Sequence, residues 1–240
     1  MGLKLLDLYC GAGGAARGYE LAGFTDIVGV DKEPQPNYPY RFIQADALNS
    51  GIDLNRFDLI HASPPCQAFT SLQNSPNSNK NHPELVAATR ELLDASDRPW
   101  VIENVYGAPL NFPTKLCGSS FHLGTGDLQL RRHRYFETRW LILSPHRCRH
   151  KGETVGVHGD SVRNTTRESK RFRVPKALRC PPPGGISIGI SRGREAMEIG
   201  WMTMKELCQA VPPAYTEFIG REIIKQLRRL SSEVNGSSQE

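Results

Sequence analysis

The run Asp7-Leu-Tyr-Cys-Gly-Ala-Gly-Gly14 lies between two segments of contrasting pattern. The apolar run Lys4–Tyr9 predicts a buried strand, and Gly14–Ala22 has helical character. Glycines in the turn between them let the backbone change direction sharply and approach a ligand closely. The N-terminal part of the chain is therefore expected to begin with a strand, a ligand-binding turn and a helix.

The same alternation continues through the first 140 residues. Glu84–Ala95 is the second predicted helix, because its small and apolar side chains fall on one face. The further strands are predicted at Ile27–Asp31, Arg41–Gln44, Phe57–Ala62, Trp100–Val105 and Tyr135–Leu143. This order predicts an α/β fold with a doubly wound, mainly parallel sheet. Ligands of such sheets bind beyond the carboxyl ends of the strands.

A basic region interrupts this pattern. Ser144–Arg194 holds twelve Lys or Arg and three acids, which gives it a charge of +9 in a chain whose net charge is +5. This predicts a surface for a polyanion, although a solvated insertion has the same composition. The predicted division is a main unit at 1–143, a small basic unit at 144–191, a return to the main unit at 192–230 and a disordered tail at 231–240.

The overall composition fits a soluble globular protein, with 38% hydrophobic and 23% charged residues in 240. No run reaches the ~18 apolar residues of a membrane span. The first residues show no secretory signal, so we expect no membrane and a cytoplasmic location. The six cysteines are then expected to be free thiols.

Acids follow the second and third predicted strands. Asp31 stands about 20 residues after the glycines, where an acid typically binds the two hydroxyls of a ribose. Asp46 is placed to hold the base or the amino acid end of the same ligand. The spacing lacks the GxGxxG pattern, which favours a ligand without phosphates, but NAD remains an alternative.

Two further motifs stand at strand ends. Ser63-Pro-Pro-Cys-Gln-Ala-Phe69 follows one strand and presents the thiol of Cys66 on a backbone fixed by two prolines. Ile102-Glu-Asn-Val105 brings Glu103 to the same edge of the sheet. A thiol and a carboxyl at adjacent strand ends suit a conjugate addition to an electron-poor ring.

These motifs together resemble the DNA (cytosine-5) methyltransferase family, which is S-adenosylmethionine-dependent. Leu130-Arg-Arg-His-Arg-Tyr-Phe136 resembles the family's arginine motif, and Glu195-Ala-Met, Gly200-Trp-Met and Ala210-Val-Pro-Pro213 resemble its late motifs. The resemblance covers nearly the whole chain except the basic insertion. It implies a Rossmann-like methyltransferase sheet in which the insertion is a target-recognition region.

The resemblance also implies a reaction. The thiolate of Cys66 attacks C6 of cytosine, while Glu103 holds the N3 edge and supplies a proton. Arg134 orients the base, Arg132 supports Glu103 or Cys66, and Asn104 buttresses the glutamate loop. The residues implied to bind S-adenosyl-L-methionine are Asp7, Tyr9, Cys10, Gly11, Ala12, Gly13, Gly14, Asp31, Asp46, Pro65, Gln209, Ala210 and Val211.

The implied partner is double-stranded DNA, from which the target cytosine is flipped out. The polar loop Gln67–His82 would close over the base. Phosphates and base edges would be contacted by Gln67, Arg163, Arg167, Lys170, Arg171 and Arg173. A compact chain with a lid makes a monomer the expectation, with a cognate restriction enzyme as a partner compatible with the family.

Two positions depart from the family pattern. Leu130 stands where the family has glutamine, with Gln129 displaced by one. Gln209 replaces the usual asparagine near the methionine end of the cofactor. One hypothesis from Gln209 is the same chemistry with an altered sulfonium cofactor.

Other functions stay open. One branch of the family methylates tRNA, and a protein that only binds DNA or an NAD-linked oxidoreductase are the remaining alternatives. Zinc is a further question, because the basic region and its borders contain His146, Cys148, His150, His158 and Cys180. Their spacing matches no standard zinc module, so the sequence favours a chain without a metal.

Overall fold

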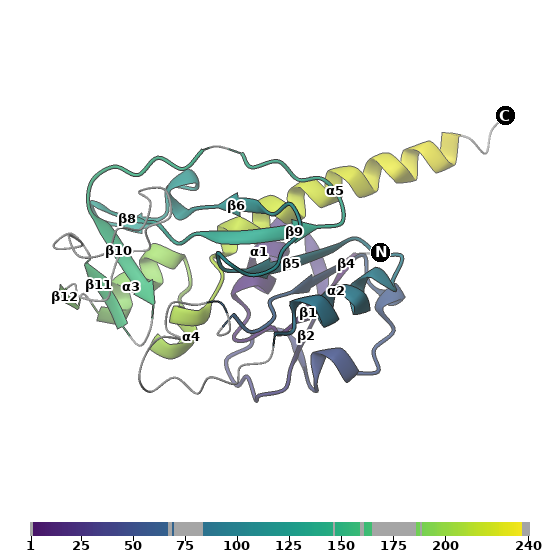
Figure 1. Ribbon diagram of the computed structural model, residues 1–240, viewed down its shortest axis with the longest axis horizontal. Coiled ribbons are helices and arrows are strands. Elements are labelled where there is room, and N and C mark those ends of the chain that lie inside the picture. Colours follow the sequence, from purple (N-terminus) through teal and green to yellow (C-terminus); the bar gives the residue numbers. More distant parts are fainter. Residues whose placement is uncertain are drawn as a thin grey trace.

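The computed structural model describes residues 2–66, 69, 84–145, 147–158, 161–164, 186–187 and 189–236, with only the backbone at 161–164, 186–187 and 234–236. Two sheets and five helices occupy this part of the chain (Figure 1). The helices are α1 (Gly14–Ala22), α2 (Val86–Asp94), α3 (Gly189–Met197), α4 (Met204–Gln209) and α5 (Pro213–Gly236). No helix in the described ranges is long and apolar enough to cross a membrane.

The larger sheet has seven strands in the order β3-β2-β1-β4-β5-β9-β6. Its first five members are parallel, and β9 pairs antiparallel with both β5 and β6. The strands are β1 (Leu3–Leu8), β2 (Phe24–Asp31), β3 (Arg41–Gln44), β4 (Leu59–Ala62), β5 (Trp100–Asn104), β6 (Thr114–Leu116) and β9 (Arg134–Thr138). This is the predicted α/β fold with a mainly parallel sheet.

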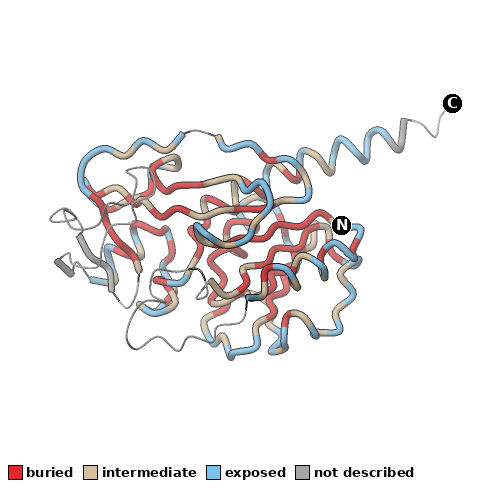
Figure 2. The backbone as a smooth tube through the Cα atoms, in the orientation of Figure 1, coloured by how far each residue is buried: buried red, intermediate tan, exposed pale blue. Residues whose placement is uncertain are grey.

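Both faces of this sheet are covered. Along β1, Leu5 packs in the cluster that contains α1 and α5, whereas Leu6 and Leu8 pack in the cluster on the α2 side. Alternate side chains point to opposite faces of a strand, so a strand buried on both faces is apolar throughout. The central strands are accordingly buried in Figure 2.

The smaller sheet has five strands in the order β12-β11-β10-β8-β7. They are β7 (Gly124–Thr125), β8 (Leu128–Leu130), β10 (Thr154–His158), β11 (Ser161–Asn164) and β12 (Ile186–Ser187). Two of them, β7 and β8, precede residue 144, so this sheet does not coincide with the predicted basic unit. The division into domains therefore stays a prediction.

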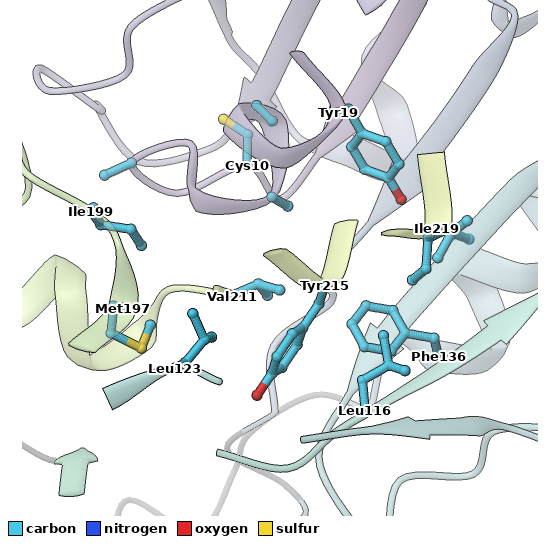
Figure 3. Close-up of a cluster of buried hydrophobic side chains, with 14 of the residues drawn as sticks. Cys10, Tyr19, Leu116, Leu123, Phe136, Met197, Ile199, Val211, Tyr215 and Ile219 are labelled. Atoms are coloured by element: carbon cyan, nitrogen blue, oxygen red, sulfur yellow. The ribbon is translucent and has the colours of Figure 1, made fainter. Parts of the chain in front are cut away.

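A single apolar cluster joins the two sheets. Figure 3 shows Tyr215 of α5 beside Val211, with Leu116 and Phe136 on one side and Leu123 on the other. The Tyr215 ring lies 6.3 Å from that of Phe136 and 5.2 Å from that of Phe121. The C-terminal return of the chain therefore fixes the small sheet against the large one.

Several predicted boundaries were wrong. The last predicted strand, Tyr135–Leu143, ends at Thr138, because the Thr138 hydroxyl donates to the Trp140 carbonyl and closes a turn. Leu141 and Leu143, which made the segment look like a strand, are exposed. The tail predicted from residue 231 continues α5 to Gly236, because residues 231–235 include neither glycine nor proline. Figure 1 shows this end of the helix extending away from the body of the molecule.

Candidate functional site

The Cys66 thiol stands just beyond β4, on a loop that other strands hold in place. The Ser63 amide donates to the Leu8 carbonyl at 3.1 Å, and the side-chain amide of Asn104 donates to the Pro64 carbonyl at 3.0 Å. The expected buttress by Asn104 thus acts on the cysteine loop itself. Cys66 remains partly exposed, as a nucleophile that meets a substrate must be.

Glu103 and Arg134 form an ion pair next to this loop. Glu103 is the fourth residue of β5 and Arg134 is the first of β9, and the two strands are antiparallel neighbours. Arg134 Nε lies 2.9 Å from Glu103 Oε1. The alignment is not that of a hydrogen bond, because Oε1 has no hydrogen-bond partner. One acceptor of the carboxylate is therefore open to a further donor.

The electrostatics of the three side chains are coupled. Burial raises the pKa of the Cys66 thiol, and the Arg134 charge opposes that rise. Burial likewise raises the pKa of the Glu103 carboxyl, against the opposing effect of Arg134. Glu103 is thus a carboxylate that can accept a proton more readily than an exposed one. Such a group suits a residue that exchanges a proton with a bound base.

A series of hydrogen bonds between buried side chains connects Tyr19 to Glu103 through His61 and Ser63. The Tyr19 hydroxyl lies 3.0 Å from Nδ1 of His61, and His61 Nε2 lies 2.9 Å from Oγ of Ser63. Ser63 in turn hydrogen-bonds to Glu103 and lowers the pKa of its carboxyl. Burial lowers the pKa of His61 to about 3, so this imidazole is neutral.

Neutrality fixes the direction of these hydrogen bonds. Ser63 donates to the Glu103 carboxylate and therefore accepts from His61 Nε2–H, which leaves Nδ1 to accept from Tyr19. Neither His61 nor Ser63 was predicted as a site residue from the sequence. Its available signal was a histidine within the apolar run Leu59–Ala62.

Arg132 has different partners from those expected. Its guanidinium donates to the carbonyls of Val157 in β10 and Cys208 in α4, and it makes no ion pair with Glu103. Its positive charge nevertheless lowers the pKa of both Cys66 and Glu103. Arg132 therefore connects the two sheets and the C-terminal return, and it acts on the site only through its charge.

The glycine turn after β1 lies where the sequence predicts. Gly11 and Gly13 have φ of 49° and 83°, in the left-handed region that glycine adopts without strain. The Asp31 carboxylate accepts from the Gly11 amide at 3.1 Å. Tyr9 is tied to α2 through its hydroxyl, which lies 3.0 Å from that of Thr89. The turn and the acid after β2 are thus held together.

The late motif contacts this turn directly. A Cβ placed on Gly14 would come within 2.6 Å of the Val211 carbonyl and 3.2 Å of the Ala210 side chain. Trp201 Nε1 donates to the Ala12 carbonyl at 2.9 Å. Ala210 and Val211 are therefore brought to the predicted ligand turn, while Gln209 is exposed at the end of α4.

The groups at this turn fit S-adenosylmethionine. Asp7 is fully buried, and neither of its carboxylate oxygens has a hydrogen-bond partner, although the nearby Tyr38 hydroxyl lowers the pKa of the carboxyl. Burial and the charge of Asp31 raise that pKa well above its usual value. Asp31 and the exposed Asp46 stand after the next two strands. Three carboxyls suit a cationic ligand with a ribose better than a dinucleotide with phosphates.

Part of the predicted site cannot be placed. Gln67, Arg167, Lys170, Arg171 and Arg173 lie outside the described residues, as do most residues of the polar loop Gln67–His82. Arg163 is a residue of β11, of which only the backbone is described. Leu130 is buried, and the displaced Gln129 donates to the Arg149 carbonyl at 3.0 Å instead of reaching the nucleophile.

The chain was compared with known proteins. Residues 3–109 match the family described as C-5 cytosine-specific DNA methylase. The type II methyltransferase M.AgeI of Thalassovita gelatinovora is 25% identical over 121 residues, which are 44% of this chain and 28% of that protein. M.DdeI of Desulfomicrobium norvegicum is 27% identical over 125 residues, with coverage of 47% and 30%. The chain thus matches less than a third of the length of these relatives.

Solved structures extend the likeness of the fold to nearly the whole chain. A protein described as a prophage-encoded DNA modification methyltransferase of E. coli superposes with a TM-score of 0.59 at 15% identity, over 94% of this chain and 99% of that one. The methyltransferase EhMeth of Entamoeba histolytica gives a TM-score of 0.56 at 12% identity, with coverage of 95% and 99%. At such identities these structures show the fold alone. Residues 3–109, less than half of the chain, thus resemble the C-5 cytosine-specific DNA methylase family.

Proposed function

We propose that this protein transfers a methyl group from S-adenosylmethionine to carbon 5 of cytosine in duplex DNA, with Cys66 as the nucleophile. The observation that carries the proposal is the position of the Glu103–Arg134 ion pair beside the cysteine loop. A thiol, a proton-exchanging carboxyl and a guanidinium are the groups that activation of a pyrimidine ring requires.

The steps follow from the chemistry of these groups. The Cys66 thiolate forms a bond to C6, and Glu103, in the protonated form that its raised pKa favours, places its proton at N3, so that electron density gathers at C5. S-adenosylmethionine, when bound, supplies an electrophilic methyl group to that carbon. A base then removes the C5 proton, the C5–C6 double bond re-forms and Cys66 departs by breaking its bond to C6, while N3 returns its proton to Glu103.

Arg134 has two functions in this scheme. Its charge favours the thiolate of Cys66, and its ion pair orients the Glu103 carboxylate toward the base. The polar chain from Tyr19 through His61 and Ser63 fixes the second side of that carboxylate. Glu103 is thus held by two elements before any substrate arrives, which reduces the reorganisation that catalysis requires.

The same arrangement disfavours two of the alternative functions. A protein that only binds DNA has no need for a buried carboxyl that is oriented from two sides. An NAD-linked oxidoreductase would leave the thiol of Cys66, beside the Glu103–Arg134 ion pair, without a function.

We assign DNA binding to the basic region. The target cytosine would be flipped out of the base stack of the duplex. In its described part, Arg147, Arg149 and Lys151 are exposed. Exposed cations suit phosphate contacts, which position a duplex without reading its sequence. The proposed reader of base edges is the rest of the region, with Arg163, Arg167, Lys170, Arg171 and Arg173.

The test is the transfer of labelled methyl groups from S-adenosylmethionine to duplex DNA, with Cys66→Ser as the matched variant. We expect label at C5 of cytosine with the wild type and none with the variant. DNA that contains 5-fluorocytosine adds a second readout, because fluorine at C5 blocks the final elimination. The wild type should then remain covalently attached to the DNA through Cys66. Label in the Cys66→Ser variant would contradict the proposed nucleophile.

A parallel reaction with tRNA as acceptor separates the two nucleic acid substrates. Label on tRNA and none on duplex DNA would replace DNA by RNA in the proposal. The cofactor is tested with a sulfonium analogue that carries a larger substituent, using the wild type and Gln209→Asn. Equal, weak binding of the analogue to both proteins would exclude a role of Gln209 in cofactor choice.

A further inference from the structure

Four potential metal ligands converge at one place outside the active centre. Cys117 follows β6, His133 precedes β9, and Cys148 and His150 lie on the segment between β9 and β10. One ligand atom from each of the four side chains lies within 4.8 Å of the other three. Segments that are distant in the sequence are thus brought together at a single point.

The four ligand atoms are nearly close enough together to surround one zinc ion. Cys117 Sγ lies 3.3 Å from His150 Nε2, and the rings of His133 and His150 have centroids 5.1 Å apart. Zinc bonds of about 2.3 Å to sulfur and 2.0–2.1 Å to nitrogen imply ligand-to-ligand distances of about 3.3–3.8 Å. The four atoms therefore need only small movements to surround an ion.

The four side chains are buried or half-buried, and one of their nitrogen atoms lacks a hydrogen-bond partner. Cys117 and His133 are buried, and Cys148 and His150 are half-buried. Nε2 of His133 is buried without a hydrogen-bond partner. A buried ring nitrogen without a partner is unfavourable, and a metal bond would remove that cost. This orphan nitrogen is a second observation, independent of the clustering, that points to a ligand.

We propose that Cys117, His133, Cys148 and His150 bind one Zn²⁺ ion as a closed, structural Cys₂His₂ site. Two thiolates neutralise the charge of the ion, so the complex can be buried beside the cationic Lys115 and Arg131. Four protein ligands leave no open position, which distinguishes a structural zinc from a catalytic one. The mixed thiolate and imidazole set selects zinc over magnesium or calcium.

The zinc site would affect the active centre through the backbone around His133. His133 stands between Arg132 and Arg134, so an ion there would anchor the start of β9 and with it the guanidinium that faces Glu103. The other ligands anchor the segment that leads into the basic region. Hydrogen bonds from Gln129 to the Arg149 carbonyl and from Arg131 to the Gly152 carbonyl also hold this segment. The inferred zinc thus connects the catalytic arginines to the proposed DNA-binding surface.

The sequence alone did not predict this set. Cys148 and His150 were among the residues considered, but their partners Cys117 and His133 come from other segments, and no zinc module has this spacing. Of the remaining candidates, His158 lies outside the cluster, and His146 and Cys180 lie outside the described residues. The sequence therefore favoured a chain without a metal, and the geometry points the other way.

The test is the metal content of the full-length protein, purified with a reducing agent and without chelators. We expect about one zinc per chain by elemental analysis, and almost none in the double variant Cys117→Ser/Cys148→Ser. Cys208→Ala is the matched control, because it removes a buried cysteine outside the cluster and should retain the zinc. Zinc retained by the double variant would place the ion elsewhere and overturn the assignment.

Cobalt provides a readout that does not depend on the fold of a variant. Wild type reconstituted with Co²⁺ should show the strong visible bands of tetrahedral cobalt with thiolate charge transfer. Removal of zinc with 1,10-phenanthroline should lower the melting temperature of the wild type. A wild type that holds less than about a tenth of an equivalent after zinc loading, or that carries a Cys117–Cys148 disulfide, would overturn the proposal.

Discussion

Nε of Arg134 lies 2.9 Å from Oε1 of Glu103, across the antiparallel pair that β5 forms with β9. The two residues come from different motifs and are joined only by the fold. Glu103 is buried and Arg134 is partly buried, so their charges interact through a medium less polar than water. The consequences of removing either charge are therefore large enough to measure.

Arg134→Met should lower kcat for methyl transfer by about 100-fold or more, because Glu103 loses the ion pair that orients it and Cys66 loses the charge that favours its thiolate. Loss of one partner of a buried ion pair should also cost about 3–5 kcal/mol of stability. The measurement is single-turnover methyl transfer, together with urea unfolding.

Arg90→Met is the matched control for this variant. It breaks a second largely buried ion pair, in which Arg90 Nε lies 2.7 Å from Glu137 Oε1, and neither residue is among the groups that shift the pKa of Cys66. We expect a similar loss of stability with kcat changed only a few-fold. Equal losses of kcat in the two variants would mean that Arg134 acts through stability alone.

The reactivity of Cys66 should increase with pH through the neutral range. Burial raises the pKa of its thiol above the ordinary value, so the thiolate is the minor form at pH 7 and its fraction grows as pH rises. Arg134→Met should move the apparent pKa of Cys66 further upward, because it removes the charge that opposes the effect of burial.

Alkylation by iodoacetamide, followed by mass spectrometry at Cys66, measures this titration. Cys66→Ser gives the background from the other thiols, of which Cys10, Cys117 and Cys208 are buried. A rate of alkylation that is independent of pH between 6 and 9, or an apparent pKa that does not move in Arg134→Met, would contradict the assigned electrostatics.

Much of the architecture could be predicted from the sequence, because buried parallel strands are apolar throughout and the turns after them carry distinctive residues. The helix Gly14–Ala22 and the strand Arg41–Gln44 were predicted at their observed bounds. The short strands β6, β7 and β8 were missed. Runs of two or three residues carry no period, and their pairing depends on distant partners.

The candidate site, like the fold, could be predicted only in part from the sequence. The positions of Cys66 beyond β4 and of Glu103 near the end of β5 could be predicted, because each motif follows an apolar run. The partners of Arg132 could not, because the carbonyls of Val157 and Cys208 have no sequence signature. Tyr19 was missed as well, since its hydroxyl meets His61 only after α1 packs on the sheet.

The neutral His61 should make the protein less stable in acid. Its pKa is about 3 in the folded protein and about 6.5 in the unfolded chain, so between these values the unfolded chain binds the additional proton. Stability from this residue is present above pH 6.5 and is lost as pH falls, by about 1.4 kcal/mol per pH unit.

His61→Gln should remove the contribution of His61 to the slope of the unfolding free energy against pH. The raised pKa of buried Asp7 contributes a slope of opposite sign, and this contribution remains in both proteins. The free energies of unfolding in urea at pH 4, 5, 6 and 7 give the two slopes. Parallel slopes for the wild type and the variant would show that His61 is not the group responsible.

The contact between α1 and α5 should tolerate no side chain at Gly18. A Cβ there would come within 2.1 Å of the Pro213 carbonyl and of the Thr216 hydroxyl, and within 2.7 Å of the Glu217 amide. Two of these atoms are backbone at the start of α5, so the helix itself must move. Gly18→Ala should therefore lower the free energy of unfolding by about 1–3 kcal/mol.

Gly200→Ala is its control, because nothing lies within 4 Å of a Cβ at Gly200 and its φ is not positive. This variant should unfold within about 0.5 kcal/mol of the wild type. Because α5 follows directly on Ala210 and Val211, the shift in Gly18→Ala should also weaken the binding of S-adenosylmethionine, measured by calorimetry. Unchanged stability and affinity in Gly18→Ala would show that the two helices can separate without disturbing the glycine turn.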